Sequence, residues 1–278
     1  MVNIEHFSLD KDSETSLDKL CRNIEATDTD CQSIIVNKIL KLNIYDYIDK
    51  SLQDLIAEFR LGDISAIHLT NLPSISHPII LSVALAYLFG QPIRYEGEGD
   101  YVVEIKSQEG AGDQPSFRNA VFFPLHTDLS YVEQPPYFFL LHSVFNDTSQ
   151  GGQTLLCDIY DVISMLSHST FDCLKTSRFY FKPPPHYSGE VQGKYPILSE
   201  LVPFSYAIRF REDMIQYSND LEKGAIEEFL NVLHSHTVHL DLLTDTAMVI
   251  NNHRCLHGRT AFTNQGQQSR HLNRVYIQ

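Results

Sequence analysis

The sequence predicts a mainly β protein with α-helices, in which a helical N-terminal region packs on an antiparallel β-barrel or sandwich. Segments between residues 14 and 60 repeat apolar side chains at three- and four-residue spacing, which is typical of amphipathic helices. From Phe117 onward the apolar residues lie mainly in short runs, which is typical of strands. No repeat or linker interrupts the chain, so we expect one domain over residues 1–278, with a helical region at 1–63 and the β core with its inserted loops at 64–278.

Five segments predict the helices. Three of them, SETSLDKLCRNIE, CQSIIVNKILKLN and DKSLQDLIAEFR, lie in the N-terminal region at residues 13–25, 31–43 and 49–60. The apolar run HPIILSVALAYLFG (77–90) predicts a buried helix that ends at Gly90. In AIEEFLNVLHSH (225–236), the apolar residues form one stripe, so we expect a helix that packs one face on the core.

Short runs rich in β-branched and aromatic residues predict the strands. They lie at residues 64–72, 100–107, 119–131, 137–145, 152–159, 179–184, 205–211, 247–253 and 273–278. Residues 108–116 (QEGAGDQPS) are expected to form a turn-rich loop.

The charge balance restricts the partners of the protein. The chain has 21 Lys and Arg residues against 35 Asp and Glu residues, a formal net charge of −14. Binding to nucleic acid or to an anionic membrane surface needs clustered Lys and Arg, so we expect neither. The charge favours a small zwitterionic or cationic ligand, and a role in solubility would explain it equally well.

The cysteines and the N-terminus indicate the compartment. The five cysteines are scattered and never form a CxxC pair, which argues against a disulfide framework and against a structural zinc site. The N-terminus lacks the layout of a signal peptide, and no window resembles a membrane span. We therefore expect a cytoplasmic protein with reduced, mostly buried thiols. No feature of the sequence indicates an oligomeric state.

The segment FPLHTDLSYVEQPP (123–136) carries the first chemical signal. His126 and Asp128 lie two positions apart among apolar residues, and residues i and i+2 of a strand project to the same face. The imidazole and the carboxylate are therefore expected to converge on one point.

A second histidine, His257, follows the apolar run MVIN and completes a possible metal site. Two histidines and one carboxylate occupy one face of an octahedron and leave positions open, which suits Fe(II) oxygenases. Zinc hydrolases can use the same ligands, but they usually add a nearby general base, as in HExxH, and this chain has no such motif. Iron is therefore favoured.

Two arginines and a threonine suggest a binding site for a dicarboxylic co-substrate. A dicarboxylic 2-oxo acid that chelates iron through its 2-oxo and C1 carboxylate groups has a distal C5 carboxylate, and the planar fork of an arginine can contact both oxygens of that carboxylate. Arg270 and Arg274 are expected to face the same side of the last strand, and Thr154 follows a glycine-containing turn at the start of another.

Taken together, these motifs resemble the iron(II)/2-oxoglutarate-dependent dioxygenases of the taurine dioxygenase superfamily. The resemblance rests on LHTDLSYVEQPP, GGQT, NNHRCLHGRT and RHLNR, in this order, over residues 117–278. The segments ISAIHLTNLP, FGQPIRYEGEGDYVVEI and LHGRTAF are similar to the clavaminate synthase-like branch, which includes hydroxylases of free amino acids.

The resemblance implies a double-stranded β-helix (jelly-roll) core and assigns roles to the site residues. It implies that His126, Asp128 and His257 bind Fe(II), and that Arg270 and Thr154 hold the distal carboxylate of 2-oxoglutarate. Arg274 matches a position that contacts either the co-substrate or the substrate. The implied reaction uses O2, converts 2-oxoglutarate to succinate and CO2, and hydroxylates an unactivated C–H bond of a small polar metabolite such as a free amino acid or a derivative.

Four further residues are candidates for substrate contacts. Ser130 would share the strand face of Asp128, Arg211 would suit a substrate carboxylate and Asp213 an amine, and Arg118 lies eight positions before His126. Solvated charges at a strand end would also account for Arg211 and Asp213.

Two alternatives remain open. With the same cofactors the outcome can be desaturation, cyclisation or isonitrile formation instead of hydroxylation. The third reading is a non-catalytic jelly-roll binding protein, which predicts the loss of a metal ligand or of the arginine anchor, and none is missing.

Overall fold

The computed structural model shows a mixed α/β protein. It describes residues 2–25, 31–95, 99–106, 119–185, 187, 189, 193–203, 205–263 and 270–278. The helices are α1 (Lys11–Glu25), α2 (Gln32–Ile39), α3 (Lys50–Leu61), α4 (Pro78–Phe89), α5 (Ile159–Ile163), α6 (His168–Thr176) and α7 (Asp220–Ser235), with 3-10 turns η1 (Ile44–Tyr47) and η2 (Thr148–Gln150). The strands are β1 (Ile4–Ser8), β2 (Ala66–Thr70), β3 (Pro92–Ile93), β4 (Val102–Lys106), β5 (Phe123–His126), β6 (Phe138–Asn146), β7 (Thr154–Asp158), β8 (Tyr180–Phe181), β9 (Leu198–Val202), β10 (Ser205–Ile208), β11 (Ile215–Gln216), β12 (Val238–Leu240), β13 (Thr246–Asn251), β14 (Cys255–Arg259) and β15 (Arg270–Ile277).

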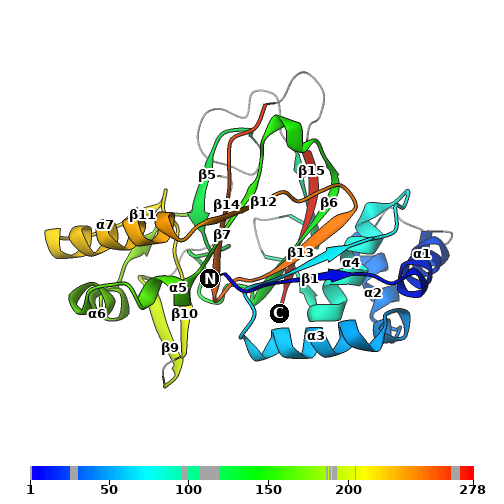
Figure 1. Cartoon of the computed structure of the whole chain (residues 1–278), viewed down its shortest axis with the longest axis horizontal. Helices are drawn as coiled ribbons and strands as arrows, with labels where there is room; N and C mark the ends of the chain where they lie inside the picture. Colours follow the sequence, from blue (N-terminus) through cyan, green and yellow to red (C-terminus); the bar gives the residue numbers. More distant parts are fainter. Residues whose placement is uncertain are drawn as a thin grey trace.

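Two larger sheets form the centre of the molecule (Figure 1). The seven-stranded sheet has the order β1-β2-β13-β6-β15-β3, and β4 also pairs with β15. The four-stranded sheet has the order β12-β7-β14-β5. Apart from the parallel pair β1 and β2, the strands of both sheets pair antiparallel.

Each face of the seven-stranded sheet packs on a different layer, because side chains alternate along a strand. On β13, Val249 belongs to the apolar cluster formed with helices α1 to α4, whereas Met248 and Ile250 belong to the cluster that includes the four-stranded sheet. On β15, Val275 likewise belongs to the cluster formed with helices α1 to α4, and Leu272 belongs to the cluster that includes the four-stranded sheet. The helix α4 lies at the centre of the first cluster and is buried on nearly all sides, which agrees with its apolar sequence.

Helices cover opposite ends of the molecule. In Figure 1, α1 to α4 lie on the right of the sheets, and α6 and α7 lie on the left, with the hairpin of β9 and β10 projecting below. Asn219 caps α7 by accepting a hydrogen bond from the backbone N–H of Glu222, which explains why the helix begins at Asp220 and not at residue 225 as expected. Gly62, with φ of 97°, ends α3 in the left-handed region, which is accessible to glycine without steric cost.

The five predicted helices and most predicted strands are confirmed, and the boundaries differ by a few residues. Three expectations were wrong. The N-terminal region also contains a strand, β1; the part of the chain expected to hold one helix after Phe117 also contains α5 and α6; and the strand expected at 119–131 ends at His126. The predicted loop at 108–116 lies outside the described residues.

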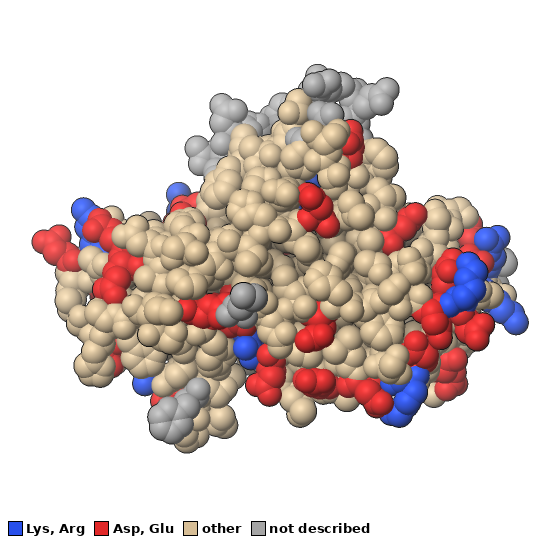
Figure 2. All heavy atoms as spheres, viewed as in Figure 1, with Lys and Arg blue, Asp and Glu red and all other residues tan. Residues whose placement is uncertain are grey.

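The surface and the thiols agree with the composition. On the face shown in Figure 2, acidic side chains are spread widely and are interspersed with fewer basic ones.

Four of the five cysteines are buried and Cys31 is exposed, and all five are free thiols. Within the described ranges, no helix combines the length and the apolar character that crossing a bilayer requires.

Candidate active site

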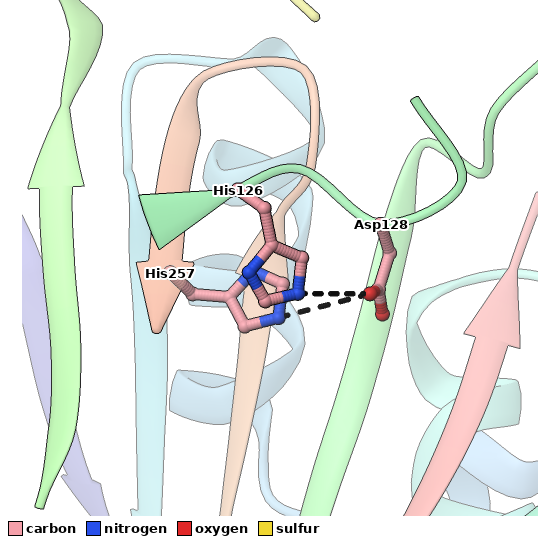
Figure 3. A group of neighbouring side chains, drawn as sticks. All are labelled: His126, Asp128 and His257. Carbon is pink, nitrogen blue, oxygen red and sulfur yellow. Dashed lines mark ion pairs between the residues drawn. The ribbon is translucent and has the colours of Figure 1, made fainter. Parts of the chain in front are cut away.

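His126, Asp128 and His257 converge between the two larger sheets. In the antiparallel pair of β5 and β14, His126 lies directly opposite His257. The Oδ1 atom of Asp128 is 3.5 Å from Nε2 of His126 and 3.8 Å from Nε2 of His257, and all three side chains are buried. Figure 3 shows both imidazoles directed at the carboxylate. One donor atom from each residue lies within 4.8 Å of the others, so the three groups can bind one metal ion.

Asp128 reaches this position from a turn and not from a strand. Strand β5 ends at His126, and Leu129 has a left-handed backbone (φ 56°), so strand alternation does not explain the convergence. The buried side chain of Asn252 fastens the turn: its Oδ1 accepts from the backbone N–H of Asp128 at 2.7 Å, and its Nδ2 donates to the carbonyl of Asp128 at 3.1 Å. The two side chains converge as expected, but the expected cause, alternation along a strand, was wrong.

The electrostatics of the triad suit a cation. Burial raises the pKa of the Asp128 carboxyl, but Arg274, at 3.5 Å, and both imidazoles outweigh burial and hold that pKa well below its usual range. Burial, together with the neighbouring His126, lowers the pKa of His257 to about 3, so its imidazole is neutral. Nδ1 of His126 lies 2.8 Å from the carbonyl of Pro124; with the proton on Nδ1 this is a hydrogen bond, and Nε2 is left as a lone-pair donor. The three groups therefore offer one anionic carboxylate oxygen and two imidazole nitrogens.

The triad shares its cavity with a cluster of buried cationic and polar side chains. The cavity is lined by Ile105, Phe123, His126, Asp128, Leu141, Thr154, His257, Gly258, Arg259, Arg270, Leu272 and Arg274. Burial and the neighbouring Arg259 lower the pKa of Arg270 to about 9, and burial lowers the pKa of Arg259 to about 10. Nε of both arginines and the hydroxyl of Thr154 have no hydrogen-bond partner among the described residues. Adjacent buried cations with unused donors form a site that fits an anion.

Arg259 is the member of this cluster that the sequence reasoning missed. Its NH2 group donates to the carbonyls of Asn119 and Val121, both at 2.7 Å, which fixes the guanidinium against the chain that leads into β5. Its position in the sequence could have indicated this role. Arg259 lies two positions after His257 on the same strand, so the two side chains project from the same face of that strand. Arg270 and Arg274 both line the cavity, as expected from their spacing on the last strand, and Thr154 begins β7 as expected.

The structure places the four candidate substrate residues differently. Ser130 lies in the turn after Asp128, fully buried, and its hydroxyl has no partner within the described part of the chain. Arg211 and Asp213 form an ion pair with each other, at 2.9 Å and 3.2 Å, and do not line the cavity of the triad. The expectation of solvated charges was wrong for this pair, because both side chains are largely buried. Arg118 lies outside the described residues.

Comparison with known families identifies the chain. The family model described as "Taurine catabolism dioxygenase TauD, TfdA family" matches residues 81–276, which span the triad, the arginines and most of both sheets. The chain belongs to the TauD/TfdA family. The superfamily resemblance expected from the four motifs is thereby confirmed.

The curated relatives match only parts of the chain. The chain is 28% identical over 195 residues to a tyrosine isonitrile desaturase of Pseudomonas aeruginosa, covering 63% of this chain and 65% of that protein. It is 25% identical over 174 residues to a 3-((Z)-2-isocyanoethenyl)-1H-indole synthase of Fischerella ambigua, covering 55% of this chain and 62% of that protein. Dioxygenase str8 of Strobilurus tenacellus is 25% identical to the chain over 170 residues, covering 55% of this chain and 40% of that protein. The matches thus span between two fifths and two thirds of these relatives.

Solved structures show the same fold over almost the whole chain. An asparagine oxygenase, in complex with Fe(II), 2S,3S-3-hydroxyasparagine and succinate, superposes with a TM-score of 0.85 at 19% identity, covering 98% of this chain and 93% of that chain. The non-heme iron oxygenase OrfP, in complex with Fe and alpha-ketoglutaric acid, has a TM-score of 0.83 at 17% identity, covering 98% and 93%. The TauD/TfdA chain therefore has the architecture of these oxygenases.

Proposed function

We propose that this TauD/TfdA chain is a single-domain Fe(II)- and 2-oxoglutarate-dependent oxygenase that hydroxylates an unactivated C–H bond of a small polar metabolite, a free amino acid or a derivative of one. The observation that carries the proposal is the shared cavity: a buried His-Asp-His triad lies beside two buried arginines with unused donors. The pairing of strands in two larger sheets, with helices α1 to α4 packed on one of them, supports the double-stranded β-helix core and helical N-terminal region that the family resemblance implies.

His126, Asp128 and His257 would hold the iron. Their donor set, two imidazole nitrogens and one carboxylate oxygen, fits ferrous iron and would leave part of its coordination sphere open. When bound, the iron activates O2 while 2-oxoglutarate is oxidised to succinate and CO2. The carbonyl of Pro124 would accept a hydrogen bond from Nδ1 of His126, which leaves Nε2 of that imidazole able to bind iron. Arg274 lies 3.5 Å from the Oδ2 atom of Asp128 and favours the ionised carboxylate.

Arg270, Thr154 and Arg259 would hold the distal carboxylate of 2-oxoglutarate. A dicarboxylate would neutralise the paired guanidinium charges and would supply acceptors for the buried Nε atoms and the threonine hydroxyl. Ile105, Phe123, Leu141 and Leu272 give the cavity apolar walls that limit water around the bound co-substrate. These residues would bind and orient the co-substrate.

The structural neighbours support an amino-acid substrate. The asparagine oxygenase and OrfP structures hold hydroxylated asparagine and hydroxylated arginine. In the present chain, Arg274 is the cavity arginine nearest Asp128 and would contact a substrate carboxylate. Ser130 offers a buried hydroxyl beside Asp128, and Arg211 and Asp213 would reach a substrate only by breaking their own ion pair. A small-molecule substrate also agrees with the acidic surface, which disfavours nucleic acid and membrane partners.

Desaturation or isonitrile chemistry is the second candidate outcome. Two curated relatives that the chain resembles are a tyrosine isonitrile desaturase and a 3-((Z)-2-isocyanoethenyl)-1H-indole synthase. The product distinguishes the outcomes, because hydroxylation adds one oxygen atom to the substrate whereas desaturation removes two hydrogen atoms.

The test begins with anaerobic addition of Fe(II) and 2-oxoglutarate, monitored by the visible absorption band of the chelate. A panel of free amino acids and their isonitrile derivatives is then scored for succinate formation in air, and products are assigned by mass. The Asp128→Ala variant is the matched control and should form neither the band nor succinate. Absence of the band in the wild-type chain would refute the proposal and would favour a non-catalytic binding protein.

A further inference from the structure

Arg209 makes an unusual set of contacts beside the triad. Its NH1 group donates to the carbonyls of Ser130, at 3.2 Å, and Val132, and its NH2 group donates to the carbonyl of Glu133 at 3.0 Å. The guanidinium also lies over the ring of Tyr195, 3.9 Å from its centroid. One half-buried arginine thus binds three carbonyls of the turn that begins at Asp128 and stacks on a distant segment.

These contacts explain how the turn is held in shape. The turn passes through the left-handed residue Leu129 and is buried as far as Val132, so the carbonyls of Ser130 and Val132 need donors. Burial lowers the pKa of Arg209, and the three acceptors offset the cost of placing its charge there. Asn252 fastens the first residue of the turn, Asp128, whereas Arg209 fastens the residues that follow it.

Arg209 is itself anchored to both sides of the site. Its backbone N–H donates to the carbonyl of Ile197 at 2.8 Å, and the next residue, Phe210, exchanges hydrogen bonds with Thr127, which lies between the two ligands His126 and Asp128. Tyr195 pairs through its backbone with Phe179. The guanidinium therefore connects the ligand-bearing turn to the segment that runs from β8 to β9.

We propose that Arg209 is a positioning residue for the metal carboxylate: it fixes the 128–133 turn so that Asp128 faces the two histidines before metal arrives. The inference rests on the proposed role of Asp128 as a ligand. The residue touches neither the imidazoles nor the carboxylate, so its effect passes through the backbone of the turn. The three carbonyl partners of Arg209 indicate this role.

The test compares metal affinity in two variants, Arg209→Met and Arg60→Met, using Co(II) absorption as a probe that does not require turnover. Arg60 is a matched control, because it also donates to two carbonyls, those of Phe89 and Leu88, both at 3.0 Å, on a different part of the molecule. Both variants are expected to unfold at lower temperature than the wild type. At a temperature where all are folded, Arg209→Met should bind Co(II) about 10- to 100-fold more weakly, the usual effect of losing a group that orients a ligand, and Arg60→Met should bind normally.

Two further variants keep the inference open to refutation if Arg209→Met does not fold. Arg209→Lys retains the charge but cannot span three carbonyls, so its affinity should lie between those of the wild type and Arg209→Met. Tyr195→Leu removes the ring below the guanidinium and should weaken Co(II) binding about fivefold. Wild-type affinity in every folded variant of Arg209 and Tyr195 would overturn the inference alone, whereas wild-type Co(II) binding that does not depend on Asp128 would overturn the proposed function as well.

Discussion

Replacing Arg270 by methionine should remove most of the affinity for 2-oxoglutarate. The guanidinium is buried, and its Nε has no described partner, so its unused donors are available to a carboxylate. Two charge-assisted hydrogen bonds contribute about 1.5–3 kcal/mol each. Because Arg259 remains and retains part of the positive charge, we expect a loss of about 3–4 kcal/mol, which corresponds to a dissociation constant raised about 100- to 1,000-fold.

The assay is an anaerobic titration of the Fe(II)-loaded chain with 2-oxoglutarate and, separately, with 2-oxopentanoate, in which a methyl group replaces the distal carboxylate. The wild-type chain should prefer 2-oxoglutarate by a factor similar to the loss in Arg270→Met, and the variant should bind the two acids about equally. Arg60→Met, far from the cavity, should retain the preference. A preference that survives in Arg270→Met but disappears in Arg274→Met would refute the assignment and would move the anchor to Arg274.

Three other perturbations test the packing around the site. Asn252→Ala removes three hydrogen bonds. It should lower the free energy of unfolding, measured in urea, by about 2–4 kcal/mol and should also weaken metal binding. An unchanged metal affinity would show that the position of Asp128 does not depend on these hydrogen bonds. Gly258→Ala places a Cβ atom 2.7 Å from the carbonyl oxygen of Phe123, so β14 and β5 must move apart. We expect the free energy of unfolding to fall by about 1–3 kcal/mol. An unchanged melting temperature would contradict this expectation. Burial lowers the pKa of His142 to about 4, so the unfolded chain binds more protons than the folded chain between about pH 4 and 6.5, and stability is lost as the pH falls through this range. Between about pH 7 and 5 the loss from this residue is about 2 kcal/mol, and urea unfolding of His142→Gln should show a correspondingly smaller decrease, whereas an equal decrease would rule the residue out.

The side chains that form the site were largely readable from the sequence because their chemistry depends on residue type. His126, Asp128 and His257 are residue types that together suit ferrous iron, and the side chains of Arg270 and Thr154 are suited to a distal carboxylate. The helices were readable for a related reason: the spacing that creates an apolar stripe is local, so it is visible without knowledge of the partner that the stripe packs on.

The short strands and turns were harder to predict from the sequence, because they are stabilised by residues that are distant along the chain. Strand β1 has five residues and forms only through pairing with β2, some sixty positions later. The helices α5 and α6 have five and nine residues, too short for a clear periodic pattern, and side-chain caps at Asp158 and Ser167 define their starts.

By itself, the sequence determined which side chains of this TauD/TfdA chain are able to bind a metal or a carboxylate, since that ability is a property of single residues. Only the tertiary structure decided how they meet. The pairing of β5 with β14 sets His126 opposite His257, and a turn held by Asn252 and Arg209 brings Asp128 to both of them. The physical reason is that a hydrogen bond to a backbone carbonyl does not require a particular residue at the acceptor position, so the contacts of Arg209 and Arg259 leave no pattern in the sequence of the segments they hold.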